Sequence, residues 1–213
     1  MSWVDIDYDL QRWVEIPATD EWNETPWDDE KDWSRSAAHV LLAMNEIAES
    51  RREVRRVAKV LVGCREVYRN SALGESHYLY FDSVAQSPIA IHLWFGPAEG
   101  ERTATLRQHV RADNSDTMRI PQVTDFPTEH YGVGLRSLNH VLLEDQSIAA
   151  NLWYALRDDE KGVDIIAFAS TGELGRLVAA EPDFDEFVRG IRVFADDEGG
   201  WAEAQGVGSD SAD

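Results

Sequence analysis

The chain has 213 residues, of which 43% are apolar and 28% are charged, a composition typical of a globular protein with one hydrophobic core. Its 40 acidic and 20 basic residues give a formal net charge of −20, which disfavours nucleic acid as a partner because phosphate contacts need an excess of basic residues. No apolar run approaches the roughly 20 residues of a membrane span, and the first residues lack the basic and apolar regions of a signal peptide. We therefore expect a cytoplasmic protein without a membrane segment.

The first 30 residues combine acidic residues with tryptophan. They hold ten acids and one base, Arg12, and five of the eight tryptophans of the chain lie at or before residue 33. Tryptophan is common both in hydrophobic cores and in binding hot spots. We therefore treat Trp3, Trp22 and Trp27 as candidates for partner binding, with core packing as the alternative.

Strand and helix patterns follow each other in the first 70 residues. Alternating apolar and acidic residues over Val4–Leu10 predict a strand with one wet face, and Trp13–Ile16 is predicted to enter the core. Thr25, Pro26 and Asp28 resemble a helix start, and the 3.6-residue spacing that follows predicts a helix over about 26–49.

A second helix is predicted over about 51–69, with a strand over Val60–Val67 as the alternative. Four cations of this helix share one face because of their spacing; they are Arg52, Arg55, Arg56 and Lys59. Three interpretations remain open: a solvated helix face, a partnership with the acidic segment 20–30, or contact with an external acidic partner. The four residues are therefore candidates for partner binding.

From Ser76 the apolar period changes to two, which predicts strands. The expected strands are His77–Ser83, Pro88–Gly96, Tyr131–Glu144, Ser147–Arg157 and Val163–Ser170, the last two joined by a hairpin loop over 158–162. A helix over 102–112 and an extended stretch around Val123 are expected between them. Capping-box patterns predict two short C-terminal helices, one after Ser170 and one that begins near Asp183 and turns Ile191 inward.

These patterns indicate an α+β protein: a mainly antiparallel β-sheet flanked by helices, with an N-terminal helical hairpin. The expected segments are an acidic, Trp-rich strand segment (1–25), the helical hairpin (26–70), and the sheet with C-terminal helices (71–194), which shares one core with the segments before it. Residues 195–213 contain acidic and small residues but no base, which predicts a disordered tail.

The chain from about residue 76 to 194 resembles the PsbP-like fold, which is shared by the Ran-binding Mog protein and the mycobacterial lipoprotein LpqN. The residues that carry the resemblance are Asp164–Thr171 and Asp183–Ile191, with Trp13–Pro17 similar to the opening strand of small uncharacterised actinobacterial proteins of that fold. The helical block at 26–70 and the lack of a lipoprotein signal depart from it. The resemblance implies an accessory or binding protein without chemistry of its own.

No catalytic, metal or cofactor site is expected. Tyr131–Ser137 nearly matches a dinucleotide-binding loop, but Ser137 replaces its third glycine, so glycines that bend a strand are the favoured interpretation. The six histidines lack the spacing of metal ligands, although His77 and His92 are expected to be neighbours across strands. The single cysteine, Cys64, lies in an apolar helical stretch, which favours an inert buried thiol.

The leading hypothesis is a non-catalytic cytoplasmic interaction factor of accessory, chaperone or immunity type, which uses its acidic surface to engage a basic protein partner. The alternative is a small-molecule-binding protein or enzyme with a pocket between sheet and helices, lined by Trp94, Trp153, His77 and His92. A weaker third hypothesis makes the cations of the second helix a specific nucleic-acid contact.

Overall fold

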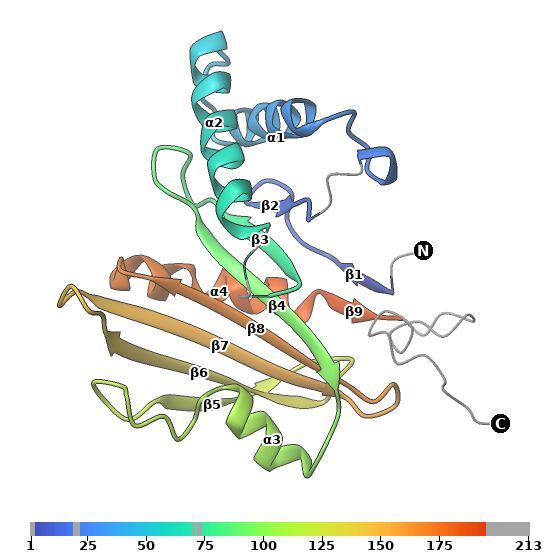
Figure 1. The fold of residues 1–213 in the computed structure, drawn as a ribbon, viewed down its shortest axis with the longest axis vertical. Helices are drawn as coiled ribbons and strands as arrows, with labels where there is room; N and C mark the ends of the chain where they lie inside the picture. The colour runs from blue at the N-terminus through green and yellow to red at the C-terminus, as the bar shows by residue number, and fades with distance from the viewer. Residues whose placement is uncertain (1–2, 19–21, 70, 72–73, 195–213) are drawn as a thin grey trace.

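The computed structural model describes residues 3–18, 22–69, 71 and 74–194. They form a seven-stranded antiparallel sheet with helices on both faces and a separate two-stranded ribbon (Figure 1). The predicted α+β class with a mainly antiparallel sheet is therefore confirmed. The predicted disordered tail, 195–213, lies outside the described residues.

The large sheet has the strand order β2-β3-β4-β8-β7-β6-β5. Its strands are β2 (Trp13–Ile16), β3 (Ser76–Tyr80), β4 (Ile89–Pro97), β5 (Gln122–Pro127), β6 (Val133–Leu142), β7 (Ile148–Asp158) and β8 (Val163–Thr171). The predicted strands of the second half are all present, and β7 and β8 form the predicted hairpin. Because β4 pairs with β8, the strands that lie between β4 and β7 in the sequence, β5 and β6, form the edge of the sheet opposite to β2.

One face of the sheet is covered by α4 (Leu174–Arg189), which lies behind the sheet in Figure 1. The prediction of two short helices is wrong, because a single helix runs through Pro182. This proline is exposed, so water can satisfy the carbonyl group that loses its hydrogen bond. The apolar spacing also continues across it, from Leu177 and Ala180 to Phe184, and holds both halves against the sheet.

A two-stranded ribbon joins the two ends of the described chain. It pairs β1 (Val4–Ile6) with β9 (Ile191–Val193), so the predicted strand over Val4–Leu10 is shorter than expected and Ile191 belongs to a strand, not to a helix. The change of structure occurs at Gly190, where an added Cβ would lie 2.0 Å from the carbonyl oxygen of Asp7. Only glycine allows these two segments of the backbone to approach this closely.

The opposite face carries α1 (Glu30–Met44) and α2 (Arg51–Tyr68) over β2 and β3, after a 3₁₀ turn at Trp22–Glu24. The predicted helix over 26–49 is wrong at both ends. Asp29, not Thr25, caps the helix and accepts a hydrogen bond from the Asp32 amide at 2.7 Å, and the helix ends before Glu46, whose φ is 53°. The second predicted helix is confirmed, so the alternative strand over Val60–Val67 is wrong.

Helix α3 (Arg102–His109) covers another part of this same face, where it packs on β6 and β7. The helical hairpin and α3 therefore cover separate parts of the face (Figure 1). Side chains of β4, β8 and β7 lie between these two parts, and they form the floor of a groove.

Candidate functional site

We call this depression the aromatic groove. It has a volume of about 500 Å³ and is lined by Trp94, Gln108, His109, Arg111, Trp153, Ile166 and Phe168. Three half-buried aromatic residues come from three adjacent strands, with Trp94 opposite Ile166 and Trp153 opposite Phe168 in the strand register. Alternate residues of a strand share a face, so this register places all three aromatic rings on the same side of the sheet.

The aromatic rings form a partly stacked floor. The ring centroids of Trp153 and Phe168 are 4.1 Å apart with an angle of 28° between their planes, and those of Trp94 and Trp153 are 6.3 Å apart at 15°. Stacked rings cover the faces that they share, so the floor offers outer ring faces and ring edges, against which planar groups and cations can pack. Two of the four residues that the sequence predicted to line a pocket, Trp94 and Trp153, therefore do line one.

The rim of the aromatic groove is basic. Arg111 follows the end of α3 with φ of 56°, and the carbon of its guanidinium lies 5.5 Å from the centroid of the Trp153 ring. None of the residues that line the groove is acidic. Neither Arg111 nor Phe168 was among the predicted site residues; the alternation of β8 could have identified Phe168, but the left-handed turn that places Arg111 had no clear sequence signal.

A buried ion pair supports α3 beside the groove. Arg157 binds Asp164 through its Nε at 2.6 Å and its Nη2 at 2.8 Å, and His109 Nε2 lies 3.2 Å from the same carboxylate. Burial by itself raises the pKa of Asp164, but the hydrogen bonds from Arg157 and His109 outweigh burial and hold this pKa below its ordinary value. The carboxylate is therefore engaged and does not neutralise Arg111.

His77 and His92 are neighbours across β3 and β4, as predicted. Their Nδ1 atoms are 2.8 Å apart, both residues are buried, and the Tyr68 ring covers them. Burial and the neighbouring His77 lower the pKa of His92 to about 4, and burial lowers the pKa of His77. The pair lies next to the aromatic floor but does not line the groove. Across the described part of the chain, no group of three potential metal ligands occurs.

A second depression, which we call the acidic groove, lies beside β1 and α4. It has a volume of about 530 Å³ and is lined by Asp7, Tyr8, Asp9, Arg12, Trp13, Glu129, Asp183, Glu186, Phe187, Arg189, Gly190 and Arg192. The arginines are engaged by the protein itself: Arg12 binds Asp183 at 2.6 Å, Arg189 lies 3.7 Å from Asp185, and Arg192 donates to backbone carbonyl groups. The exposed carboxylates therefore give the groove its negative character.

The predicted binding tryptophans are half-buried and pack on the protein itself. The Trp3 ring lies 4.9 Å from that of Phe95, and Trp27 packs on the cluster beneath α1 and α2. The guanidinium of Arg65 lies 4.9 Å from the Trp22 ring and binds Glu30 at 2.8 Å. Sequence reasoning missed Arg65, the cation that holds the acidic segment.

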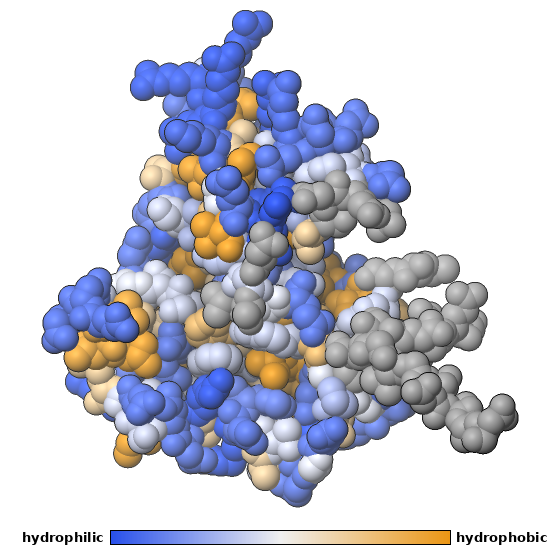
Figure 2. All heavy atoms as spheres, viewed as in Figure 1, coloured by the Kyte–Doolittle hydropathy of each residue, from blue (hydrophilic) through white to orange (hydrophobic). Residues whose placement is uncertain are grey.

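The predicted cationic face of α2 is exposed. Arg52, Arg55 and Lys59 extend into solvent, and Figure 2 shows hydrophilic residues over the outer ends of α1 and α2. Arg56 binds Glu53 at 2.8 Å and the Val84 carbonyl oxygen at 2.9 Å. The structure does not bring these four cations together with the predicted binding tryptophans into one cavity.

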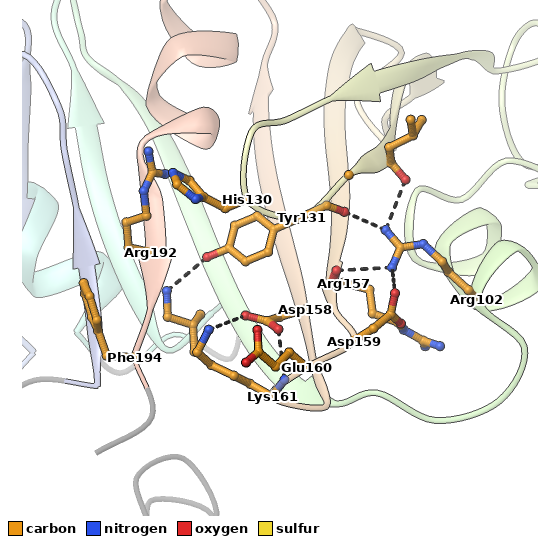
Figure 3. A pocket seen from close by; sticks show the side chains of 13 residues that line it. Arg102, His130, Tyr131, Arg157, Asp158, Asp159, Glu160, Lys161, Arg192 and Phe194 are labelled. Atoms are coloured by element: carbon orange, nitrogen blue, oxygen red, sulfur yellow. Dashed lines mark hydrogen bonds and ion pairs between the residues drawn. The ribbon is translucent and has the colours of Figure 1, made fainter. Parts of the chain in front are cut away.

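A third depression, of about 1060 Å³, lies at the β7–β8 hairpin loop (Figure 3). Its charged groups mostly satisfy each other. Arg102 donates to the carbonyl oxygen of Tyr131 at 2.8 Å and pairs with Asp159, and Lys161 binds Asp158 at 2.8 Å. The arrangement connects the hairpin loop to α3 and β6, which favours a structural role.

Comparison with known proteins finds similarity in fold. The chain is similar to the Ran-binding protein Mog1p of Saccharomyces cerevisiae, with a TM-score of 0.41, 11% identity, and coverage of 60% of this chain and 83% of that one. It is also similar to cyanobacterial PsbP (CyanoP) of Synechocystis, with a TM-score of 0.40, 14% identity, and coverage of 59% and 77%. They represent the two groups that the sequence resembles, and at these scores the likeness carries no argument about function.

No protein-family model and no curated protein matches the sequence. The resemblance to LpqN and to actinobacterial proteins stays a prediction. None of the helices in the described ranges has the length and apolar character needed to cross a membrane.

Proposed function

We propose that the chain is a non-catalytic cytoplasmic protein-interaction factor, of accessory, chaperone or immunity type, whose acidic surface engages a basic protein partner. The observation that carries this proposal is the way in which the N-terminal segment is built. Its tryptophans face inward and fix the segment to the core, and its carboxylates face outward along the acidic groove.

The anchoring is extensive. Trp13 is 3% exposed, and its ring centroid lies 4.3 Å from that of Phe187 on α4 and 5.0 Å from that of Tyr80 on β3. The carboxylates of Asp7 and Asp9 are exposed at the other side of the same segment. A partner that binds carboxylates on a fixed scaffold orders fewer side chains, which lowers the entropic cost of association.

The charge of the acidic groove selects for a basic partner. Five carboxylates line it against three arginines, and when the pair of Arg12 and Asp183 is set aside the carboxylates still outnumber the arginines four to two. In a chain of net charge −20, such a groove steers lysine and arginine side chains toward it and repels acidic competitors.

The exposed cations of α2 supply a separate contact of opposite sign. We propose that Arg52, Arg55, Arg56 and Lys59 receive an acidic segment of the same partner, with the exposed edges of Trp3, Trp22 and Trp27 as neutral contacts. A non-catalytic role is supported by the Cys64 thiol, whose pKa is raised by burial, which disfavours the reactive thiolate.

A pull-down tests the proposal. The tagged chain is exposed to the cytoplasm of its source organism at about 0.1 M and 0.5 M salt, and retained proteins are identified by mass spectrometry. We expect one stoichiometric basic partner that is lost at the higher salt concentration. Asp7→Asn, Asp9→Asn and Glu186→Gln together are expected to abolish its capture.

The matched control removes the same charge elsewhere, at three exposed carboxylates: Glu66→Gln, Asp116→Asn and Glu144→Gln. We expect this control to retain the partner. Equal loss in both variants would refute the assignment to the acidic groove, and a complex unchanged at about 1 M salt would refute an electrostatic interaction.

A further inference from the structure

We propose that the aromatic groove is a binding site for a small planar aromatic anion, of the aryl carboxylate class. This inference concerns a second site, on the sheet face opposite to α4, and does not depend on the partner proposed for the acidic groove. It follows from the floor, the size and the charge of the groove.

The floor is an uncovered part of the sheet. On one side, Leu79, Phe81 and Ala90 are buried beneath α1 and α2; on the other side, Ala155 is buried beneath α3. Between these clusters Trp94, Trp153 and Phe168 remain half-buried, and Figure 2 shows pale and orange residues between α2 and α3, bordered by blue ones. Large aromatic side chains in such a position offer a stacking surface.

The size of the groove fits a small molecule. Ligand sites measure roughly 300–1,000 Å³, and the aromatic groove measures about 500 Å³. A stable protein interface needs about 800 Å² on each partner, which is far more surface than the seven lining residues present. We therefore favour a compact ring system that packs against the aromatic floor of Trp94, Trp153 and Phe168.

The charge of the groove selects an anion. No carboxylate lines it, although the chain holds twice as many acids as bases. Two carboxylates that contact the C-terminal end of α3 are already engaged, Asp164 by Arg157 and Asp113 by Arg107 at 2.8 Å. Among the residues that the structure describes, Arg111 is therefore a guanidinium held over an aromatic ring without a carboxylate partner, and a ligand carboxylate would supply one.

The two parts of the ligand would be recognised separately. The ring would pack against the floor, and Arg111 would donate two parallel hydrogen bonds to the carboxylate while it stays over the Trp153 ring. The exposed amide of Gln108 would bind a polar substituent of the ring. A nucleic-acid strand is a poorer occupant, because the net charge of −20 repels a polyanion and one arginine cannot neutralise it.

Calorimetric titration tests the proposal with two matched probes, indole-3-carboxylate and its neutral amide, indole-3-carboxamide. We expect the carboxylate to bind roughly tenfold more tightly than the amide, because charge-assisted hydrogen bonds are about twice as strong as neutral ones. Arg111→Gln is expected to remove this difference. Arg35→Gln, an exposed control on α1, lies outside the groove and is expected to preserve it.

Both arginines are exposed, so neither variant is expected to unfold the protein, and near-ultraviolet circular dichroism checks this. Trp153→Leu is expected to weaken binding of both probes. The proposal is overturned if neither probe binds in the millimolar range, if the amide binds as well as the acid, or if the two arginine variants behave alike. Salt-sensitive binding of a short oligonucleotide that Arg111→Gln abolishes would overturn it in favour of a polyanion.

Discussion

Asp164→Asn should destabilise the fold strongly, because it removes the charge from a buried ion pair. Asp164 is 2% exposed and Arg157 is 4% exposed, and the two are joined by hydrogen bonds of 2.6 and 2.8 Å. Arg157 also donates to the carbonyl oxygens of Glu99 and Gly100, so its guanidinium cannot move into solvent without releasing this loop.

The magnitude follows from this burial. Removing one partner of a buried pair costs about 3–5 kcal/mol, and asparagine keeps one acceptor, so we expect a loss near the lower limit, about 3 kcal/mol. The assay is urea unfolding at pH 7, followed by tryptophan fluorescence. Asp159→Asn is the control: Asp159 pairs with Arg102 but its side chain is 68% exposed, so we expect a loss of less than about 1 kcal/mol.

The dependence on pH gives a second test of the same pair. The pKa of Asp164 is lowered in the folded state, so its contribution is complete above the ordinary carboxyl pKa, about 3.9, and is lost as the pH falls through the folded value. Asp164→Asn should remove this part of the acid sensitivity. A loss below about 1 kcal/mol, or one equal to that of Asp159→Asn, would refute the importance of the buried pair.

Two further predictions concern stability. Because the pKa of His92 is lowered to about 4 by burial and by His77, the unfolded state binds the proton first as the pH falls. Stability should therefore decrease from about pH 6.5 to about pH 4, and His92→Phe should reduce this decrease in urea unfolding; an unchanged profile would contradict it. Gly190→Ala should destabilise the fold by more than about 2 kcal/mol, because its Cβ would meet the Asp7 carbonyl oxygen at 2.0 Å. Gly175→Ala, in helix α4 with open space around it, should instead be neutral or stabilising by up to about 1 kcal/mol, and equal effects of the two changes would contradict the close approach.

The sequence predicted the sheet well because its strands keep a period-two alternation; in β4 the large apolar residues Ile89, Ile91 and Leu93 all lie in the core on the α4 side. It failed where tertiary contacts override local signals. Pro182 and the capping pattern at Asp183 indicate a helix start, yet Asp183 lies within α4 and accepts hydrogen bonds from Arg12 and Tyr80. The three-residue strand at Ile191 exists only because β1 returns to pair with it.

The candidate sites were predictable in part. The alternation of β4 and β7 places Trp94 and Trp153 on strand faces, and the structure brings them together at the groove. The part of the sheet face that α3 leaves uncovered depends on the path of the segment between β4 and β5. Local sequence patterns do not encode this path. The position of Arg111 depends on the left-handed turn after α3, so its role could be recognised only in three dimensions.

The central claim, that a basic partner binds at the acidic groove, is tested most directly by nuclear magnetic resonance. An arginine-rich peptide is titrated into the ¹⁵N-labelled chain at about 0.1 M salt, and shifts of the backbone amides are mapped. We predict that the largest shifts lie along β1 and the C-terminal half of α4, around Asp7, Asp9 and Glu186. Shifts spread evenly over the acidic loops, or no shifts at all, would contradict the account.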